Sequence, residues 1–292
     1  MKRFELLEPN SLDEAFRLLS EYGDEARVYA GGTALVKLMK KRLVHPSYLV
    51  NIKGLKGLHY IREDEEGLKI GALATLREIE TSPLVRQRLK VVGEMVHTIG
   101  SVQIRNVGTL AGNLCFADPA SDPAPILIAL GANLKIASSE GERILPVEKF
   151  FTDFYETALS QGEILEEIQI PFLPKDSGAV YLKHTMRVAF DLAVVGAAVR
   201  LDVNAKDDVC MSSKIVLGGV ASTPVRVKKA EELLKGKVIN DTLITKVAMA
   251  ASTEVDPIQD VRASAEYRRE MIEVFVERGL QKALERAKGG VL

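Results

Sequence analysis

Residues 98–122 read TIGSVQIRNVGTLAGNLCFADPASD, and this stretch determines how the rest of the chain is interpreted. It uses glycine and uncharged polar residues where a buried segment would use large apolar ones. Gly100, Gly108 and Gly112 permit backbone geometries and close approaches that a Cβ atom would block. Beside them lie amide and hydroxyl side chains that can meet a ligand: Asn106, Thr109 and Asn113. We predict a binding loop for a phosphate-bearing ligand.

A second glycine turn precedes this loop. Residues 26–29 predict a short strand that runs into Ala30-Gly-Gly-Thr33, and the apolar spacing of Leu35, Leu38 and Met39 predicts a helix directly afterwards. Backbone N–H groups at a glycine turn bind anions, and a helix that starts there adds the positive end of its dipole. Both turns would suit a diphosphate, although a single Gly-Gly between strand and helix is also an ordinary tight turn. Neither turn matches a P-loop or the GxGxxG fingerprint, which disfavours nucleotide hydrolysis and an ordinary NAD site.

The binding loop ends in Asp118-Pro-Ala-Ser-Asp122, which carries two carboxylates. These groups could hydrogen-bond a ribose. Asp122 could instead cap a helix that begins at Pro123, and Asp118 could form an Asx turn. The residues leave both alternatives open.

The N-terminal part of the chain predicts a compact α/β pattern followed by mixed elements. Residues 4–7, 26–29 and 48–52 predict strands of a small βαβαβ unit, whose first helix opens at the capping box Ser11-Leu-Asp-Glu14. The elements predicted beyond it are strands at 58–62, 68–71, 133–137 and 164–171, and helices from the second capping box Thr75-Leu-Arg-Glu78, at 91–99 and at 123–130. The strand at 164–171 alternates strictly and is expected to end the first domain.

The C-terminal part shows a different pattern. Pro174 to Gly178 predicts a linker, because turn-forming residues cluster there. The elements predicted after it are strands at 180–186, 193–203 and 214–220, then helices at 225–234, 242–254 and 263–287. Strands followed by helices indicate an α+β domain with helices on one face of an antiparallel sheet. We therefore predict a first domain over 1–173, divided into subdomains of about 1–55 and 56–173, and a second domain over 178–292.

Composition narrows the class of protein. The 292 residues are 47% hydrophobic, enough for the cores of two domains, and the net charge of −1 gives no global field for nucleic acid or an anionic membrane. No apolar run is long enough to span a membrane, so we expect a soluble, cytoplasmic protein.

Cys115 and Cys210 lie far apart, which excludes an iron–sulfur cluster held by this chain alone. We expect no metal site, because the four histidines show no ligand spacing, and we see no catalytic triad.

The motifs together match a known family. Ala30-Gly-Gly-Thr33, Ile104-Arg-Asn-Val-Gly-Thr-Leu-Ala-Gly-Asn113 and Asp118-Pro-Ala-Ser-Asp122 closely resemble the FAD-binding (medium) subunit of the molybdenum hydroxylases, the xanthine dehydrogenase and carbon monoxide dehydrogenase family. Thr223-Pro-Val-Arg226, which leads into residues 230–236, and then residues 260–269 resemble the C-terminal domain of the same subunits. The resemblance covers nearly the whole chain.

The resemblance implies a fold and a site. The fold would be a two-part FAD-binding domain of the PCMH/VAO kind, followed by a domain with a three-stranded antiparallel sheet and three helices. Both glycine turns would hold the FAD diphosphate, Asp122 would contact the nucleotide portion, Ile99 would lie near the flavin, and Lys183 would approach from the second domain. The expected cofactor-binding residues are Ala30, Gly31, Gly32, Thr33, Ala34, Leu35, Ile99, Gly108, Thr109, Gly112, Asn113, Cys115, Asp122 and Lys183.

One expected residue, Cys115, and one residue outside that set, Ala111, need a comment. Cys115 is expected to be small packing near the cofactor rather than a nucleophile. Ala111 stands where a glycine is more usual in the family. It indicates either a backbone that is not left-handed or a slightly altered loop.

The resemblance also implies a function. A molybdenum site on a large subunit would hydroxylate substrate, two [2Fe–2S] clusters on a small subunit would carry the electrons, and FAD here would pass them to NAD⁺, oxygen or another acceptor. The chain would then belong to a hetero-oligomer, with a dimer of heterotrimers as one arrangement, and would hold no catalytic residue of its own. The alternatives are a stand-alone FAD-dependent oxidoreductase and a non-catalytic nucleotide-binding scaffold.

Overall fold

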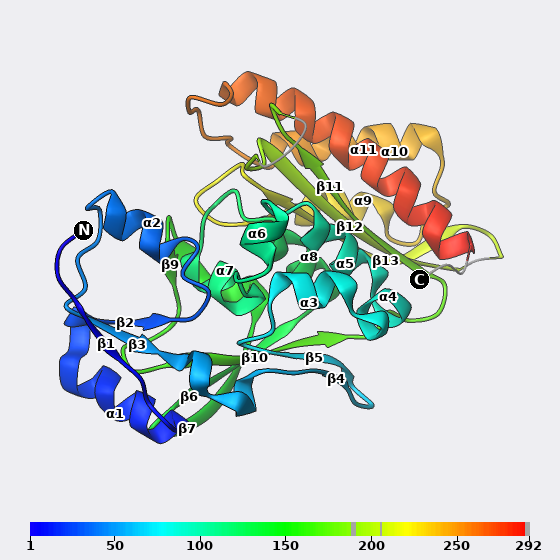
Figure 1. The fold of residues 1–292 in the computed structure, drawn as a ribbon. Coiled ribbons are helices and arrows are strands. Elements are labelled where there is room, and N and C mark those ends of the chain that lie inside the picture. The colour runs from blue at the N-terminus through cyan, green and yellow to red at the C-terminus, as the bar shows by residue number, and fades with distance from the viewer. Residues whose placement is uncertain (188–190, 205, 290–292) are drawn as a thin grey trace.

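The structure is a computed structural model that describes residues 1–187, 191–204 and 206–289. Along the chain these residues form a small N-terminal sheet, a five-stranded middle sheet with many short helices, and a C-terminal sheet covered by longer helices (Figure 1). The α+β class that we predicted is confirmed.

The N-terminal part is the predicted βαβαβ unit. It contains β1 (Glu5–Leu7), α1 (Leu12–Tyr22), β2 (Ala26–Tyr29), α2 (Leu35–Lys40) and β3 (Tyr48–Asn51). The strands pair in parallel in the order β1-β3-β2. The Ser11 side chain caps α1 by accepting a hydrogen bond from the Glu14 N–H, as the capping pattern predicts.

The middle part is built on an antiparallel sheet in the order β4-β5-β10-β6-β7. Its strands are β4 (Ile61–Glu63), β5 (Gly67–Gly71), β6 (Asn133–Ser138), β7 (Gly141–Pro146) and β10 (Ile164–Pro171), and β8 (Phe151–Asp153) and β9 (Glu156–Thr157) form a separate hairpin. The helices are α3 (Leu76–Thr81), α4 (Pro83–Arg88), α5 (Lys90–His97), α6 (Val102–Arg105), α7 (Leu110–Phe116) and α8 (Pro123–Leu130).

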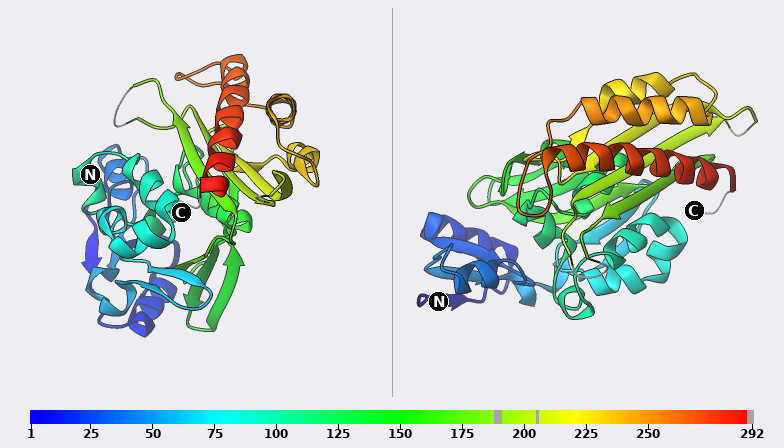
Figure 2. Two further views of the ribbon diagram at one scale, coloured as in Figure 1. Left: turned by 90° about the vertical axis from the view of Figure 1, so that its right-hand side faces the viewer. Right: turned by 90° about the horizontal axis from the view of Figure 1, so that it is seen from above.

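The C-terminal part is a layered domain. Its sheet runs β11 (Ser177–His184), β12 (Val195–Asn204), β13 (Val209–Gly218) and β14 (Val225–Arg226), all antiparallel. The helices α9 (Lys228–Leu234), α10 (Asp241–Thr253) and α11 (Ala265–Gly289) pack on one face of this sheet (Figure 2). Helix α8 of the middle part packs on the other face.

Several predicted elements differ in detail from the structure. The three long C-terminal strands are present, but the two-residue β14 adds a fourth at the point where we predicted the start of a helix. The predicted linker is shorter, because Ser177 and Gly178 already belong to β11. The predicted strand at 58–62 starts later, since Lys56–Leu58 forms a 3₁₀ turn.

The strict alternation predicted for residues 164–171 is wrong. The pairing of β10 with β6 shifts register between Leu165 and Glu167. Ile164 and Leu165 are both buried as a result, and so are Glu167 and Ile168. A bulge of this kind disrupts the ladder locally and changes the direction in which the side chains point.

Candidate functional site

The two glycine turns, which are far apart in sequence, lie directly against each other. A Cβ atom on Gly31 would stand 2.2 Å from the Val107 carbonyl oxygen and 2.8 Å from the Gly108 Cα atom. On the other side, a Cβ atom on Gly108 would stand 3.5 Å from the Thr33 hydroxyl oxygen. Only glycine allows this backbone-to-backbone contact, so the structure brings the two predicted halves of the site together.

The first turn presents a run of backbone donors. Among the described residues, no acceptor lies within hydrogen-bonding geometry of the N–H groups of Gly31 to Leu35. Gly32 has a φ of +69°, which turns the chain before α2 begins at Leu35. Consecutive N–H groups that point out of such a turn form an anion-binding concavity.

The second turn leads into α7 in the same way. Thr109 caps the helix by accepting a hydrogen bond from the Gly112 N–H at 2.9 Å. The N–H group of Ala111 meets no acceptor in the part of the chain that the structure describes, whereas Leu110 follows an isolated β-bridge between Thr75 and Thr109. Gly112 is exposed, so the first turn of α7 is open to a ligand. Both turns therefore fit an anionic group such as a diphosphate.

Ala111 and Asn113 occupy helical positions in α7. Ala111 is buried in the core, and its helical backbone agrees with the expectation that this position is not left-handed. The Asn113 amide oxygen accepts a hydrogen bond from the Ser121 hydroxyl at 2.6 Å. This bond joins the beginning of α7 to the segment that precedes α8.

Asp122 and Lys183 come together, but they bind each other. Lys183 Nζ lies 2.7 Å from Asp122 Oδ2 and donates a second hydrogen bond to the Thr98 carbonyl. The Tyr181 hydroxyl donates to the other carboxylate oxygen at 2.7 Å. Burial raises the pKa of Asp122, while Lys183 and Tyr181 act in the opposite direction. The pair fastens the middle part to the C-terminal sheet.

Asp118 and Asp122 differ in the local hydrogen bonds that their side chains make. The Asp122 side chain makes no capping hydrogen bond to α8. Asp118 does form an Asx turn, because its Oδ1 accepts a hydrogen bond from the Ala120 N–H at 2.9 Å.

Ile99 lies in a turn that a buried ion pair holds in place. Arg105 donates from Nη1 to the carbonyl oxygens of Ile99 and Gly100, and its Nε lies 2.9 Å from Glu80. Burial tends to raise the pKa of Glu80, but hydrogen bonds from His97, Arg77 and Arg105 outweigh it and lower that pKa to about 2. Ile99 itself is 8% exposed and packs in the core.

Cys115 sits on the side of α7 that packs against the core. Burial of its thiol raises the pKa of Cys115 to about 12, which leaves it protonated and unreactive at neutral pH. Two expected residues, Ala34 and Leu35, have apolar side chains, so only their backbone N–H groups could meet an anion.

Sequence reasoning missed the residues that support the site: Tyr181, Arg105 and Glu80. The Arg105 contacts could have been suspected, because Arg105 is the one basic residue in the sequence from 98 to 122. The partners of Arg105 and Asp122 lie 25 and 59 or more residues away, and no local pattern predicts such pairs.

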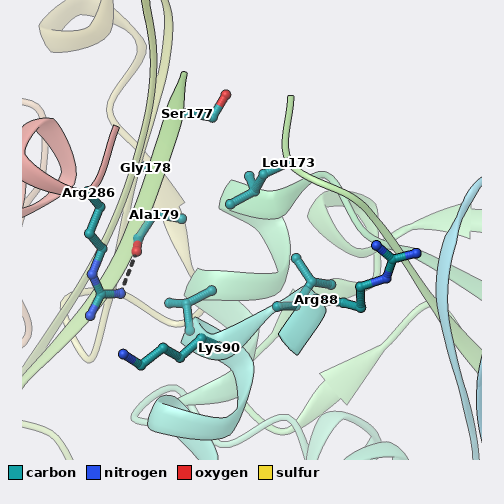
Figure 3. Close-up of a pocket in the computed structure, with 9 residues that line it drawn as sticks. Arg88, Lys90, Leu173, Ser177, Gly178, Ala179 and Arg286 are labelled. Atoms are coloured by element: carbon teal, nitrogen blue, oxygen red, sulfur yellow. Dashed lines mark hydrogen bonds between the residues drawn. The ribbon is translucent and has the colours of Figure 1, made fainter. Parts of the chain in front are cut away.

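Two pockets lie away from the glycine turns. One is a small crevice between α4, α5 and β11, lined by Arg88, Lys90, Ser177 and Arg286 (Figure 3). Its two arginines form ion pairs with Glu63 and Glu94. The other is an open pocket of about 320 Å³ beside His59, Tyr60 and Glu78. Within the described residues, no group of three or more His, Cys, Asp or Glu side chains could hold a metal ion, and no helix is long and apolar enough to cross a membrane.

Comparison with known proteins identifies the family of the chain. Residues 2–173 match the FAD binding domain in molybdopterin dehydrogenase, and residues 180–283 match the CO dehydrogenase flavoprotein C-terminal domain. The chain is 36% identical to the 6-hydroxypseudooxynicotine dehydrogenase complex subunit alpha of Paenarthrobacter nicotinovorans, over 98% of this chain and 96% of that one. It is 33% identical to the carbon monoxide dehydrogenase medium chain of Afipia carboxidovorans, over 98% of each.

The fold also matches that of a solved relative. The structure of carbon monoxide dehydrogenase from Hydrogenophaga pseudoflava superposes with a TM-score of 0.94 at 32% identity, covering 98% of both chains. The protein is therefore an FAD-binding oxidoreductase subunit. More particularly, it belongs to the medium-subunit family of the molybdenum hydroxylases, of the carbon monoxide dehydrogenase and xanthine dehydrogenase type.

Proposed function

We propose that the two glycine turns hold the diphosphate of FAD. The observation that carries this proposal is the run of N–H groups from Gly31 to Leu35, which lies against the second turn at Val107 and Gly108. The cofactor-binding residues would be Ala30, Gly31, Gly32, Thr33, Ala34, Leu35, Gly108, Thr109, Gly112 and Asn113 at the diphosphate, with Ile99, Cys115, Asp122 and Lys183 around the rest of the molecule.

The roles of these residues differ. The two turns would bind the diphosphate through backbone donors, and Thr109 would keep the first turn of α7 in the required geometry. Arg105 would fix the turn at Ile99, beside the flavin. Asp122 and Lys183 also bind each other, and this pair would hold the C-terminal sheet against the site. Bound FAD would supply the redox chemistry, accepting electrons and passing them on.

We further propose that this subunit works inside a larger complex. Electrons from iron–sulfur clusters of a small subunit, reduced by a molybdopterin-binding large subunit, would reach FAD here and leave to NAD⁺ or another acceptor. Relatives described as medium chains or complex subunits support this assembly. We place the complex in the cytoplasm. We also propose domains at 1–173 and 178–292, because one buried cluster lies mainly in the first range and the other lies wholly in the second.

Purification of the full chain tests the proposal. We expect a flavin absorbance band close to one FAD per chain, and co-purification of an iron–sulfur chain and a molybdopterin chain from the native host. A colourless protein that takes up no added FAD would refute the cofactor site. Substrate-dependent flavin reduction by this chain alone would instead favour a stand-alone oxidoreductase.

A further inference from the structure

The N-terminal sheet presents a side-chain pair that the proposed site does not use. Strands β1, β2 and β3 run parallel, so their carboxyl ends lie at one edge (Figure 1). Tyr29 ends β2 directly before the first glycine turn, and Asn51 ends β3 two residues before Lys53. Ligands of parallel sheets bind outside the carboxyl ends of the strands. Lys53 therefore belongs to the same edge as the turn.

Side-chain contacts hold Lys53 beside this turn. Its Nζ lies 4.9 Å from the centroid of the Tyr29 ring, within the range of a cation–π contact. The same ring lies against the turn, because a Cβ atom on Gly32 would stand 2.5 Å from its edge. The Asn51 side chain accepts a hydrogen bond from the Lys53 N–H at 3.3 Å. Tyr29 thus contacts both the ammonium group and the glycine turn.

The charge around this edge is positive. Residues 26–60 contain seven lysines and arginines and no aspartate or glutamate. Among the described residues, no carboxylate forms an ion pair with Lys53. Glu8, the acidic residue that follows β1, accepts a hydrogen bond from Asn51 instead.

A cation would add charge-assisted hydrogen bonds to those that the N–H groups make with a diphosphate. Lys183 is already paired with Asp122. We infer that Lys53, oriented by the ring of Tyr29, is a cation of the FAD diphosphate site. This inference rests on the proposed function, since it requires the diphosphate at Gly31 to Leu35. It adds a charged side chain to a site otherwise made of backbone groups.

The test compares two lysines three residues apart. Full-length protein stripped of flavin is titrated with FAD and with riboflavin, which lacks phosphate, and flavin fluorescence is followed at low and high salt. Lys53→Met should weaken FAD binding about tenfold or more at low salt, less at high salt, and leave riboflavin binding unchanged. Lys56→Met, which also removes an exposed charge, should bind FAD like the wild type. Lys53→Arg should restore most of the affinity.

A second probe does not depend on riboflavin. Inorganic pyrophosphate, titrated directly into the flavin-free protein, should bind the wild type more tightly than Lys53→Met. Tyr29→Leu should weaken FAD binding in the same direction, whereas Tyr29→Phe should not.

The binding experiments distinguish a failure of the inference about Lys53 from a failure of the proposed FAD site. If the wild type binds FAD and Lys53→Met binds it equally well at low salt, the inference is wrong and the FAD site stands. Equal loss of FAD and riboflavin would also overturn the inference, because it would reveal a disturbed fold rather than a lost phosphate contact. A wild type that binds no FAD would overturn the proposed function and the inference together.

Discussion

At the scale of single residues, the site depends on two kinds of position. Gly31 and Gly108 bring two backbone segments into contact, and a side chain on Gly31 would collide with a carbonyl group that cannot rotate away. Asp122 and Lys183 are a buried ion pair, in which each partner compensates the other's desolvation. The glycines could be predicted from the sequence because their spacing is local. The mutual pairing of Asp122 and Lys183 could not, because folding brings them together from opposite sides of a domain boundary.

Gly31→Ala should therefore separate the two turns. The added Cβ atom would stand 2.2 Å from the Val107 oxygen, so the backbone would have to shift at an expected cost of about 1–3 kcal/mol. We expect FAD occupancy, measured by absorbance after gel filtration, to fall sharply. Gly57→Ala is the matched control, since a Cβ atom there meets nothing within 4 Å. Full flavin occupancy in Gly31→Ala would show that the contact between the turns is not needed.

Lys183→Met should give a pH-dependent loss of stability. Removal of the cation leaves the buried Asp122 carboxylate uncompensated, at about 3–5 kcal/mol near neutral pH. Burial already raises the pKa of Asp122, and loss of Lys183 raises it further. The folded variant then binds a proton more readily than the unfolded chain. The difference in unfolding free energy between the wild type and the variant should therefore shrink as the pH falls. Urea denaturation at pH 8 and pH 5 measures this, and the double variant Asp122→Asn/Lys183→Met should recover part of the loss. An equal deficit at both pH values would contradict the prediction.

At the scale of elements, short helices determine the geometry of the site. Glu80 on α3 contacts His97 at the end of α5 and Arg105 at the end of α6, and so joins three helices around the turn at Ile99. We predicted residues 98–122 as a loop, although they contain α6 and α7. Helices of four and seven residues offer too few turns for an apolar periodicity to show. By contrast, the second capping box, Thr75 with Glu78, is a local signal and is present.

Glu80→Gln should loosen this connection and change the acid stability. The pKa of Glu80 is lowered from 4.5 to about 2, so its contribution is complete above pH 4.5 and disappears as the pH falls toward 2. We expect the variant to be less stable by about 3 kcal/mol at pH 7 and its stability to depend less on pH between 5 and 3. Thermal unfolding followed by circular dichroism gives both quantities. Glu142→Gln, at an exposed pair with Lys135, should change stability by less than about 1 kcal/mol. If the two variants behave alike, Glu80 does not hold these helices together.

At the scale of the whole molecule, one helix belongs to both domains. All eight residues of α8 are buried, because one side of the helix packs in the middle part and the other on β12 and β13. A helix that is apolar on every side is expected only where protein surrounds it. Its sequence, PAPILIAL, predicted the helix but not its packing on the C-terminal sheet. The C-terminal sheet is correspondingly apolar on both faces, since Ala198 and Val216 face α8 while Val199 and Ile215 face the helices α9 to α11.

This shared helix predicts that the two domains cannot be separated without loss. Residues 174–292 alone would expose the face of the sheet that α8 covers, and residues 1–173 alone would expose α8. We expect each fragment to aggregate or to bind the dye ANS, because a contiguous apolar surface exposed to water favours association. Co-expression of the two fragments should restore a soluble one-to-one complex by gel filtration, held also by the Asp122–Lys183 and Glu94–Arg286 pairs. A soluble, monomeric C-terminal fragment that unfolds cooperatively and binds no ANS would contradict the prediction. It would show that the C-terminal sheet folds with the helices on its other face and does not require α8.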